Sequence, residues 1–457
     1  MKFIRKYSLS FWVLNSLEFL NMLAYQCALL QLPIYISQKD VAGGLHWDQT
    51  VKGVLFFWWA LMQNIVPIVA GGYADRFGHR RTLFFSFSFV TIGYVLIGTQ
   101  TSFLPFLAGT LMLGFGLGVY RPTLKGAVAM SLSDGNSASG WGLYFMMLNT
   151  AVMLASLLSY WLKSISWQAV FFGSAAIFSL NFLLLALLRK SNFGTPEETE
   201  ESRNPLRILK SSVVSFFDGR IFWLIMIMSA FFIIYMQFYE TLTNFILDWT
   251  DTSFFVEFFD LPAWLTMATP RGTMLSYEAI YMLNSAFIIV SVVYVSKIAG
   301  RFRAPFALGI GILTAGAGLV VTGTTSLGFV AILGVLLYTL GEMISNTRLT
   351  DFIGRMAPAN KKALYMSYIN IAMAIGFGVG SLMGGFLYRH MSEKAYLAAY
   401  HLQNEYSIRV DSLSGAIEKL QLVKGLSPDE ATQLLWQTYS PWAIWLVFFG
   451  IGMVAVV

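Results

Sequence analysis

Apolar residues along this sequence gather in blocks of about 18 or more positions that hold few or no charges. As an α-helix, a block of that length rises about 1.5 Å per residue and crosses the roughly 30 Å of hydrocarbon in a bilayer. Short segments of alternating polarity, which a membrane barrel requires, do not occur. The pattern predicts an all-α membrane protein with twelve transmembrane helices, near residues 10–36, 51–71, 80–99, 102–130, 138–163, 165–189, 219–249, 273–297, 304–323, 327–356, 361–389 and 439–457.

A polar stretch in the middle of the chain divides these helices into two bundles of six. Residues 190–217 contain Gly-Thr-Pro-Glu-Glu-Thr-Glu-Glu-Ser, whose composition is typical of a disordered linker, followed by a short amphipathic segment that suits a helix on the membrane surface. We therefore expect an N-terminal bundle at 1–189, this linker, and a C-terminal bundle at 218–457. A second polar segment, 390–438, has apolar residues near helical spacing and a helix start at Ser427, and it predicts a small helical insertion on the outer side.

Composition agrees with a membrane protein, because 56% of residues are hydrophobic and only 12% are charged, against about 25% in soluble domains. The net charge of +6 comes from basic residues that lie between the apolar blocks, so it indicates orientation rather than nucleic-acid binding. Their excess in the short loops of one side predicts that both termini are cytoplasmic in a bacterial-type inner membrane. The first apolar block, which continues to about Ile36 without a cleavage site, is expected to be retained as a span.

Few charged residues fall inside the predicted spans. Lys52 is assigned to an outer loop, which leaves three basic residues at membrane depth: Arg121, Lys125 and Arg348. A charge near the bilayer centre costs at least about 2.5–3.5 kcal/mol on insertion scales, so it normally faces a wet cavity or an opposite charge. The embedded acidic candidates are Glu18, Glu240, Glu342 and Asp351, while Asp248 and Glu278 are placed near the outer ends, where they reach water.

These charges suggest a polar passage between the two bundles. Glu18 and Arg121 lie near the middle of their spans, and the alternative to a passage is a permanent ion pair between them. Lys125 lies one turn from Arg121 and is expected in the same cavity, to which Glu240 is a further candidate. Glu342 and Glu18 are the proton-carrier candidates, because a carboxylate in a partly dehydrated cavity can exchange protons near neutrality.

Other kinds of chemistry find no support in the residues. The lone Cys27 excludes an internal disulfide and is expected to pack in the interior. No nucleophile–histidine arrangement, metal-ligand cluster or phosphate-binding loop occurs, so we expect no enzyme activity, no metal and no cofactor. The glycines at 114, 116 and 118 lie in an apolar span and predict close helix packing.

The segment Gly71-Gly72-Tyr73-Ala74-Asp75-Arg76-Phe77-Gly78-His79-Arg80-Arg81 follows the second predicted span. It resembles the signature loop of the major facilitator superfamily, Gly-x-x-x-Asp-Arg-x-Gly-Arg/Lys-Arg/Lys. The resemblance implies the major facilitator fold, in which Asp75 and Arg76 are gate residues; the alternative is that they only anchor the topology. Arg348 and Asp351, three positions apart on one predicted helix face, are candidates for a second gate or a packing ion pair.

Further stretches resemble the proton-dependent oligopeptide transporters of that superfamily. Gly341-Glu342-Met343-Ile344-Ser345-Asn346-Thr347 resembles the family's Glu-x-x-x-Ser-Pro helix, in which the Glu receives a peptide amino group, and Gly118-Val119-Tyr120-Arg121-Pro122 stands where the family has Gly-x-Lys-Pro. Arginine at that position cannot usefully lose a proton. The segment 18–26 keeps Glu18 and Tyr25 of the family's first-helix motif but lacks its second Glu and its Arg. Tyr235-Met236-Gln237 and Asn284 match short family segments.

The resemblance implies secondary active transport of a small zwitterionic or anionic solute, such as a di- or tripeptide, by alternating access and coupled to protons. The implied substrate-binding residues are Arg121, Glu342, Tyr25, Gln237, Asn284 and Asn346. Efflux of amphipathic drugs or lipid-like molecules is the alternative within transport, and a non-transporting sensor or assembly protein is the alternative outside it. We expect the bilayer, a small-molecule substrate and protons as partners, no nucleic acid, and a monomer.

Overall fold

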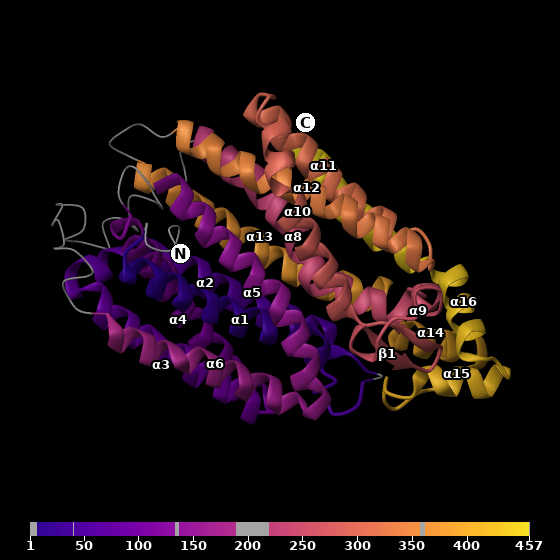
Figure 1. Ribbon diagram of the computed structural model, residues 1–457. Helices are drawn as coiled ribbons and strands as arrows, with labels where there is room; N and C mark the ends of the chain where they lie inside the picture. The colour runs from indigo at the N-terminus through magenta and orange to yellow at the C-terminus, as the bar shows by residue number, and fades with distance from the viewer. Residues whose placement is uncertain (1–6, 40, 133–136, 189–218, 357–361, 457) are drawn as a thin grey trace. The chain divides into compact units, whose positions relative to one another are not determined.

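The computed structural model describes residues 7–39, 41–132, 137–188, 219–356 and 362–456, and it is helical almost throughout (Figure 1). In the first part of the chain the helices are α1 (Leu9–Ser37), α2 (Gln49–Phe77), α3 (His79–Thr99), α4 (Phe103–Met130), α5 (Ser137–Ile165) and α6 (Trp167–Leu187). The second part contains α8 (Gly219–Trp249), α9 (Ser253–Phe259), α10 (Tyr277–Ala299), α11 (Ala304–Gly323), α12 (Gly328–Met356), α13 (Lys362–Met391), α14 (Lys394–Tyr406), α15 (Ala416–Lys424), α16 (Pro428–Tyr439) and α17 (Ile444–Val456). The all-α class is confirmed.

The long helices match the predicted spans. Among the described residues, eleven helical segments are long and apolar enough to cross a membrane, and a twelfth is counted when 428–439 and 441–456, which meet at 55°, are taken as one bent span. The main difference lies at 250–276, where the eighth span begins at Tyr277 rather than at 273. There the chain forms α9, a 3-10 turn at Ala263–Leu265, and an antiparallel hairpin of β1 (Thr266–Thr269) and β2 (Gly272–Leu275). These elements are too short to produce a periodic sequence pattern.

The second polar segment is helical, as its sequence predicted. Residues 390–438 contain α14, α15 and α16, and α16 begins at the expected residue. The Ser427 side chain accepts a hydrogen bond from the Glu430 backbone, and the Glu430 side chain accepts one from the Ser427 backbone, which is a complete capping box. The segment is joined to a spanning helix, because Trp249 of α8 donates its indole N–H to the Ser392 carbonyl. The linker at 190–217 lies outside the described residues.

The chain forms two compact units that share several of the long helices. Unit 1 consists of residues 1–29, 58–228 and 353–378, and unit 2 of residues 30–57, 229–352 and 379–457. Helices α1, α2, α8, α12 and α13 therefore contribute residues to both units. The division at the 190–217 linker stays a prediction.

Glycines bring the helices of unit 1 close together. A Cβ on Gly116 would lie 2.6 Å from Val90 of α3, while one on Gly114 would lie 2.8 Å from Trp59 of α2. The Ser86 hydroxyl strengthens the α3–α4 contact by donating to the Gly116 carbonyl. The predicted close packing of this tract is therefore confirmed. Cys27 also packs as expected, buried among apolar residues of α5 and α6.

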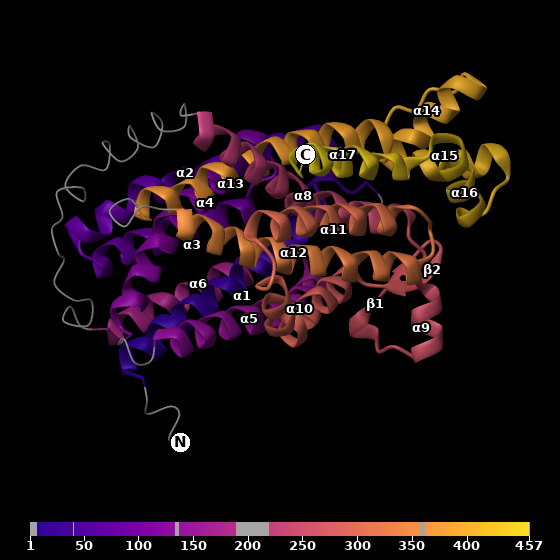
Figure 2. The same ribbon diagram turned by 90° about the horizontal axis from the view of Figure 1, so that it is seen from above.

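In unit 2 a close helix crossing joins α11 and α12. A Cβ on Gly318 would lie 2.3 Å from the Tyr338 backbone nitrogen, and one on Gly341 would lie 2.2 Å from the Ala315 nitrogen. Helix α17 packs on the other side of α11, where Trp445 closes over Gly323. Figure 2 shows α11 and α12 running side by side to the end that carries β1, β2 and α9.

A third contact in unit 2 joins the beginning of α2 to α8 and α13. Gly53 lies against the Ser381 carbonyl, which is 2.5 Å from the position of an added Cβ. Beside it, Lys52 is completely buried, and its ammonium group lies 3.4 Å from the Glu240 carbonyl oxygen and near enough to the Glu240 carboxylate for the two charges to interact. Burying one such charge alone would cost several kcal/mol, and the attraction between the two opposite charges offsets part of this cost.

The α11–α12 crossing predicts which glycines tolerate a methyl group. Gly318→Ala should lower the free energy of unfolding by about 1–3 kcal/mol, because the two backbones must separate to admit the methyl group. Gly450→Ala is the matched control, since nothing lies within 4 Å of an added Cβ there. Thermal unfolding of the purified protein measures both changes. Equal melting temperatures for the two variants would show that the crossing is not tightly packed.

The Lys52–Glu240 contact predicts a non-additive response to mutation. Lys52→Met or Glu240→Gln alone leaves one buried charge without its partner and should destabilise the protein by about 3–5 kcal/mol. The double variant should recover much of that loss, because neither charge then remains. The melting temperatures of the wild type, the two single variants and the double variant form a double-mutant cycle. Losses of stability that are strictly additive would contradict the pairing.

Candidate functional site

Unit 1 holds Arg121 by contacts that leave part of its guanidinium group available. The amide orientation of Gln63 that pairs donors with acceptors places its carbonyl oxygen 2.9 and 3.3 Å from Nη1 and Nη2 of Arg121. The guanidinium carbon also lies 5.3 Å from the centre of the Tyr25 ring, a cation–π contact. Arg121 is half-buried and Lys125, one turn further along α4, is exposed. Because a guanidinium has five N–H donors, it can bind a carboxylate while it keeps the Gln63 contact.

The Glu18 carboxylate belongs to the same unit, but it is held by neutral groups. Tyr144 donates its hydroxyl to one oxygen at 3.0 Å, and Asn21 donates its amide to the other at 3.4 Å. Lys125 and Arg121 are near enough to act on Glu18 electrostatically. Within the described residues the contacts of Glu18 and Arg121 are therefore to separate neutral partners, which does not favour a permanent ion pair between them.

Unit 2 places Glu342 in a buried polar group on α12. Asn284 of α10 donates to the Thr339 hydroxyl at 2.8 Å and to the Glu342 carboxylate at 3.5 Å. The residues Glu342 and Asn284, which come from separate sequence segments, are thus brought together. Asn346 lies one turn further along α12 and is exposed.

Aromatic residues pack beside Glu342. The hydroxyl groups of Tyr235 and Tyr239 are 3.3 Å apart, and the Tyr239 ring stacks on Tyr281 with centroids 5.8 Å apart. The Tyr338 hydroxyl donates to the Tyr235 carbonyl, and the charge of Glu342 acts on both Tyr239 and Tyr338. The result is a cluster of rings and hydroxyl groups next to one carboxylate.

Gln237 lies in the same part of α8, but its contacts are those of a helix joint. Its amide nitrogen donates to the carbonyls of Ile233 and Gly380, and its oxygen accepts from Thr241 at 2.6 Å. The side chain is fully buried and connects α8 to α13. Its assignment to substrate binding stays a prediction, although these contacts favour a structural role.

The gate candidates are described only in part. Arg348 is buried, and its guanidinium donates to the Phe302 carbonyl at 2.8 Å, which ties α12 to the end of the α10–α11 connection. The side chains of Asp75, Arg76 and Asp351 lie outside the described residues. Their gate roles stay predictions.

Several acidic and basic groups proved to be more buried than their sequence positions indicated. Lys52 was assigned to a loop, but it lies in the first turn of α2 and faces the interior. Asp248 and Glu278 were expected to reach water, and both are buried: Tyr388 and Gln38 donate to Asp248, and Gln31 donates to Glu278 at 2.8 Å. Hydropathy counts miss such residues because they do not give the direction of a side chain near a helix end. The glutamines at 31 and 38 were the one available indication, since amides inside an apolar block need partners.

A group of ionic contacts lies near the loop that joins the end of α1 to the beginning of α2. Arg389 of α13 forms a salt bridge with Asp48, and it lies 3.8 Å from Glu393. In the loop before α2, the Lys39 ammonium donates to the carbonyls of His46 and Trp47. Burial lowers the pKa of Lys39, against the opposing effect of Glu393. The contacts fix this loop to the beginning of the 390–438 segment within unit 2.

Known proteins resemble this chain in sequence and in fold. It is 29% identical to the Tetracycline resistance protein, class C, of Escherichia coli over 166 residues, which are 36% of this chain and 40% of that protein. It is 25% identical to the Multidrug efflux protein YfmO of Bacillus subtilis (strain 168) over 148 residues, or 32% of this chain and 37% of that protein. The chain thus spans about two fifths of the length of these curated relatives.

Among solved structures, a POT family transporter in complex with 5-aminolevulinic acid has the same fold. Its TM-score is 0.69 at 16% sequence identity, over 92% of this chain and 96% of that one. A family model described as Major Facilitator Superfamily matches residues 14–381. Because that match covers most of the chain, the protein belongs to the major facilitator superfamily.

Proposed function

We propose that this protein is a secondary active transporter that moves a small zwitterionic or anionic solute, such as a di- or tripeptide, by alternating access and coupled to protons. The observation that carries the proposal is that Arg121 in unit 1 and Glu342 in unit 2 carry opposite charges and are each held by neutral neighbours. A carboxylate suits Arg121 and an amino group suits Glu342, and a zwitterionic solute has both groups.

The anionic group of the solute is assigned to Arg121. The contacts with Gln63 and Tyr25 fix the plane of the guanidinium, so that its remaining donors point in a defined direction. An oriented guanidinium binds a carboxylate through two parallel hydrogen bonds, which gives directional recognition as well as charge. Lys125, exposed one turn away, adds positive charge for the same group.

The amino group is assigned to Glu342 and its surroundings. A carboxylate beside tyrosine rings suits an ammonium ion, since the ion can pair with the carboxylate and lie against ring faces. Asn284 supports this role by orienting the carboxylate. The exposed Asn346, one turn along the helix, is assigned to a polar group of the same solute.

Proton coupling is assigned to Glu18 and Glu342. Arg121 stays charged at any physiological pH, so it cannot carry the proton. Glu18 and Glu342 are buried carboxyl groups whose partners are hydroxyl and amide groups, and these can bond either protonation state. Exchange of a proton for the solute's ammonium at Glu342 would link the two movements.

Movement between the two access states needs contacts that break and form again. We assign this to Asp75 and Arg76, at the end of α2, and to Arg348 with Asp351, because charged contacts at helix ends can be exchanged without loss of helix structure. As a member of this superfamily, the protein is assigned to a lipid bilayer. The basic residues in its short loops support the assignment to an inner membrane with both termini in the cytoplasm.

The known ligand of the similar structure supports the substrate class. That transporter binds 5-aminolevulinic acid, which has one amino group and one carboxylate group. Export of amphipathic drugs is the second candidate, because one relative is named a multidrug efflux protein. The embedded charges favour the first candidate, since an amphipathic drug does not need one partner of each sign.

The function is tested by uptake of labelled di- and tripeptides into proteoliposomes under an imposed proton gradient. The wild type should accumulate peptide. Glu342→Gln should lose the response to the gradient, and its apparent affinity should fall roughly tenfold to hundredfold, because a hydrogen bond to a charged group contributes about 1.5–3 kcal/mol.

Glu418→Gln is the matched control, since it makes the same change at an exposed carboxylate of α15 and should transport like the wild type. Wild-type protein could instead transport dyes while it neither takes up peptides nor is inhibited by them. That result would replace this proposal with drug efflux. Gradient-driven uptake that survives in Glu342→Gln would remove the proton-coupling role of this residue.

A further inference from the structure

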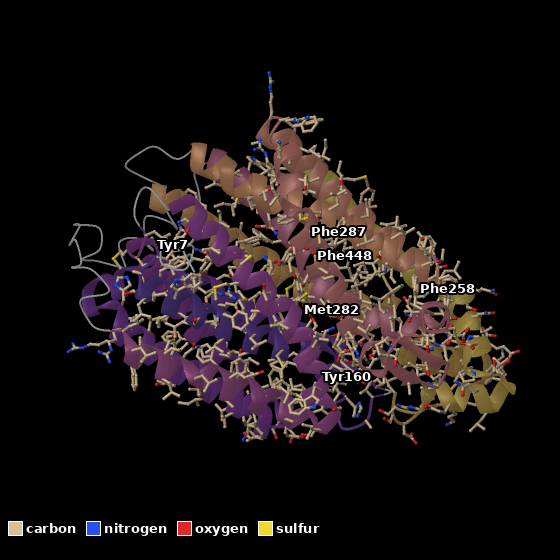
Figure 3. The ribbon with its side chains drawn as sticks, viewed as in Figure 1. Tyr7, Tyr160, Phe258, Met282, Phe287 and Phe448 are labelled. Atoms are coloured by element: carbon tan, nitrogen blue, oxygen red, sulfur yellow. The ribbon has the colours of Figure 1, made fainter. Side chains whose placement is uncertain are left out.

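Helix α9 exposes an unusual number of aromatic rings for a segment outside the spans. Three of its four phenylalanines are more than half exposed: Phe254 at 59%, Phe258 at 68% and Phe259 at 59% (Phe258 is labelled in Figure 3). The rings pair along the helix, with Phe254 stacked on Phe258 at 5.5 Å and Phe255 on Phe259 at 6.2 Å. They occupy one side of the helix, and Ser253 and Glu257 occupy the other. Such a face is costly in water.

The chain fixes α9 at the level where the spanning helices end. It begins only four residues after α8 ends at Trp249. Between the two helices, Asp251 pairs with the turn between α11 and α12: its N–H donates to Ser326, and its carbonyl accepts from Gly328 at 2.6 Å. The short link to α8 and the hydrogen bonds of Asp251 therefore hold α9 beside the ends of the spanning helices.

The aromatic face continues the apolar surface of a spanning helix. Phe255 of α9 stacks on Phe329 of α12, with centroids 6.4 Å apart and an interplanar angle of 19°. Phe329 and Leu333, one turn apart on α12, are both exposed, as side chains that face lipid on a membrane helix must be. Trp264, in the 3-10 turn after α9, is also exposed, and tryptophan favours the membrane–water boundary.

We propose that α9 is an interfacial membrane anchor, which lies along the bilayer surface with Phe254, Phe258 and Phe259 inserted below the lipid headgroups. Its partner is the lipid surface itself. Charge does not drive the contact, because residues 251–260 contain three acidic residues and no basic one. Insertion therefore depends on apolar contact and does not require anionic lipid. The anchor would hold the connection between α8 and α10 at a constant depth while the spanning helices move.

The sequence allows a direct depth measurement, because Cys27 is its one cysteine. In a Cys27→Ala background, Phe258→Cys is spin-labelled and the full chain is reconstituted in phosphatidylcholine vesicles. Collision with oxygen, compared with collision with a water-soluble nickel chelate, gives the depth of the label. The label at 258 should lie roughly 5–10 Å below the headgroup level.

Two control labels accompany the depth measurement at position 258. Glu257→Cys tests the opposite side of the same helix, and Leu422→Cys tests an apolar residue of α15 that is 84% exposed; both labels should collide freely with nickel. A label at 258 as accessible to nickel as the one at 422 would show that the face lies in water and would overturn the proposal. A label at 258 protected from both reagents would show a protein partner instead, which also overturns it.

Discussion

A charged side chain inside a membrane bundle must find its hydrogen-bond partners there, because lipid offers none, and both units are arranged around this requirement. Arg121 obtains an amide oxygen and an aromatic face, and Glu18 obtains a tyrosine hydroxyl and an asparagine amide. Glu342 obtains an asparagine. Each of these three side chains has neutral partners among the described residues, which in the proposed function leaves its charge for a ligand or a proton. A protein that only needed stability would replace these groups with apolar ones.

The contact of Lys52 with Glu240 follows a different logic. Here two opposite charges are buried near each other at a glycine contact between helices, and neither is open to a small solute. Removal of only one partner leaves an uncompensated buried charge and destabilises the protein. The pair therefore makes the contact of α2 with α8 and α13 specific. Unit 2 therefore contains both kinds of embedded charge, one kind fixed by its counter-ion and the other left with neutral neighbours.

Much of the fold could be predicted from the sequence, because a span of about 20 apolar residues is the strongest pattern that a chain can carry. The helix start at Ser427 and the packing role of the 114–118 glycines were also visible, as each depends on local chemistry. The hairpin and α9 were not, because elements of four and seven residues have no period to detect. Lys52 was misplaced since hydropathy does not show which way a side chain points, and the helix-joint contacts of Gln237 depend on a glycine 143 positions away.

Recognition of the solute's anionic end by Arg121 can be measured in a binding cycle. Affinities of wild-type protein and Arg121→Gln are measured for a dipeptide and for its C-terminal amide, which lacks the carboxylate. Either change alone should weaken binding roughly tenfold to hundredfold, and the two together should weaken it little further. Losses that simply multiply would mean that the carboxylate binds elsewhere, and the assignment of Arg121 would be wrong.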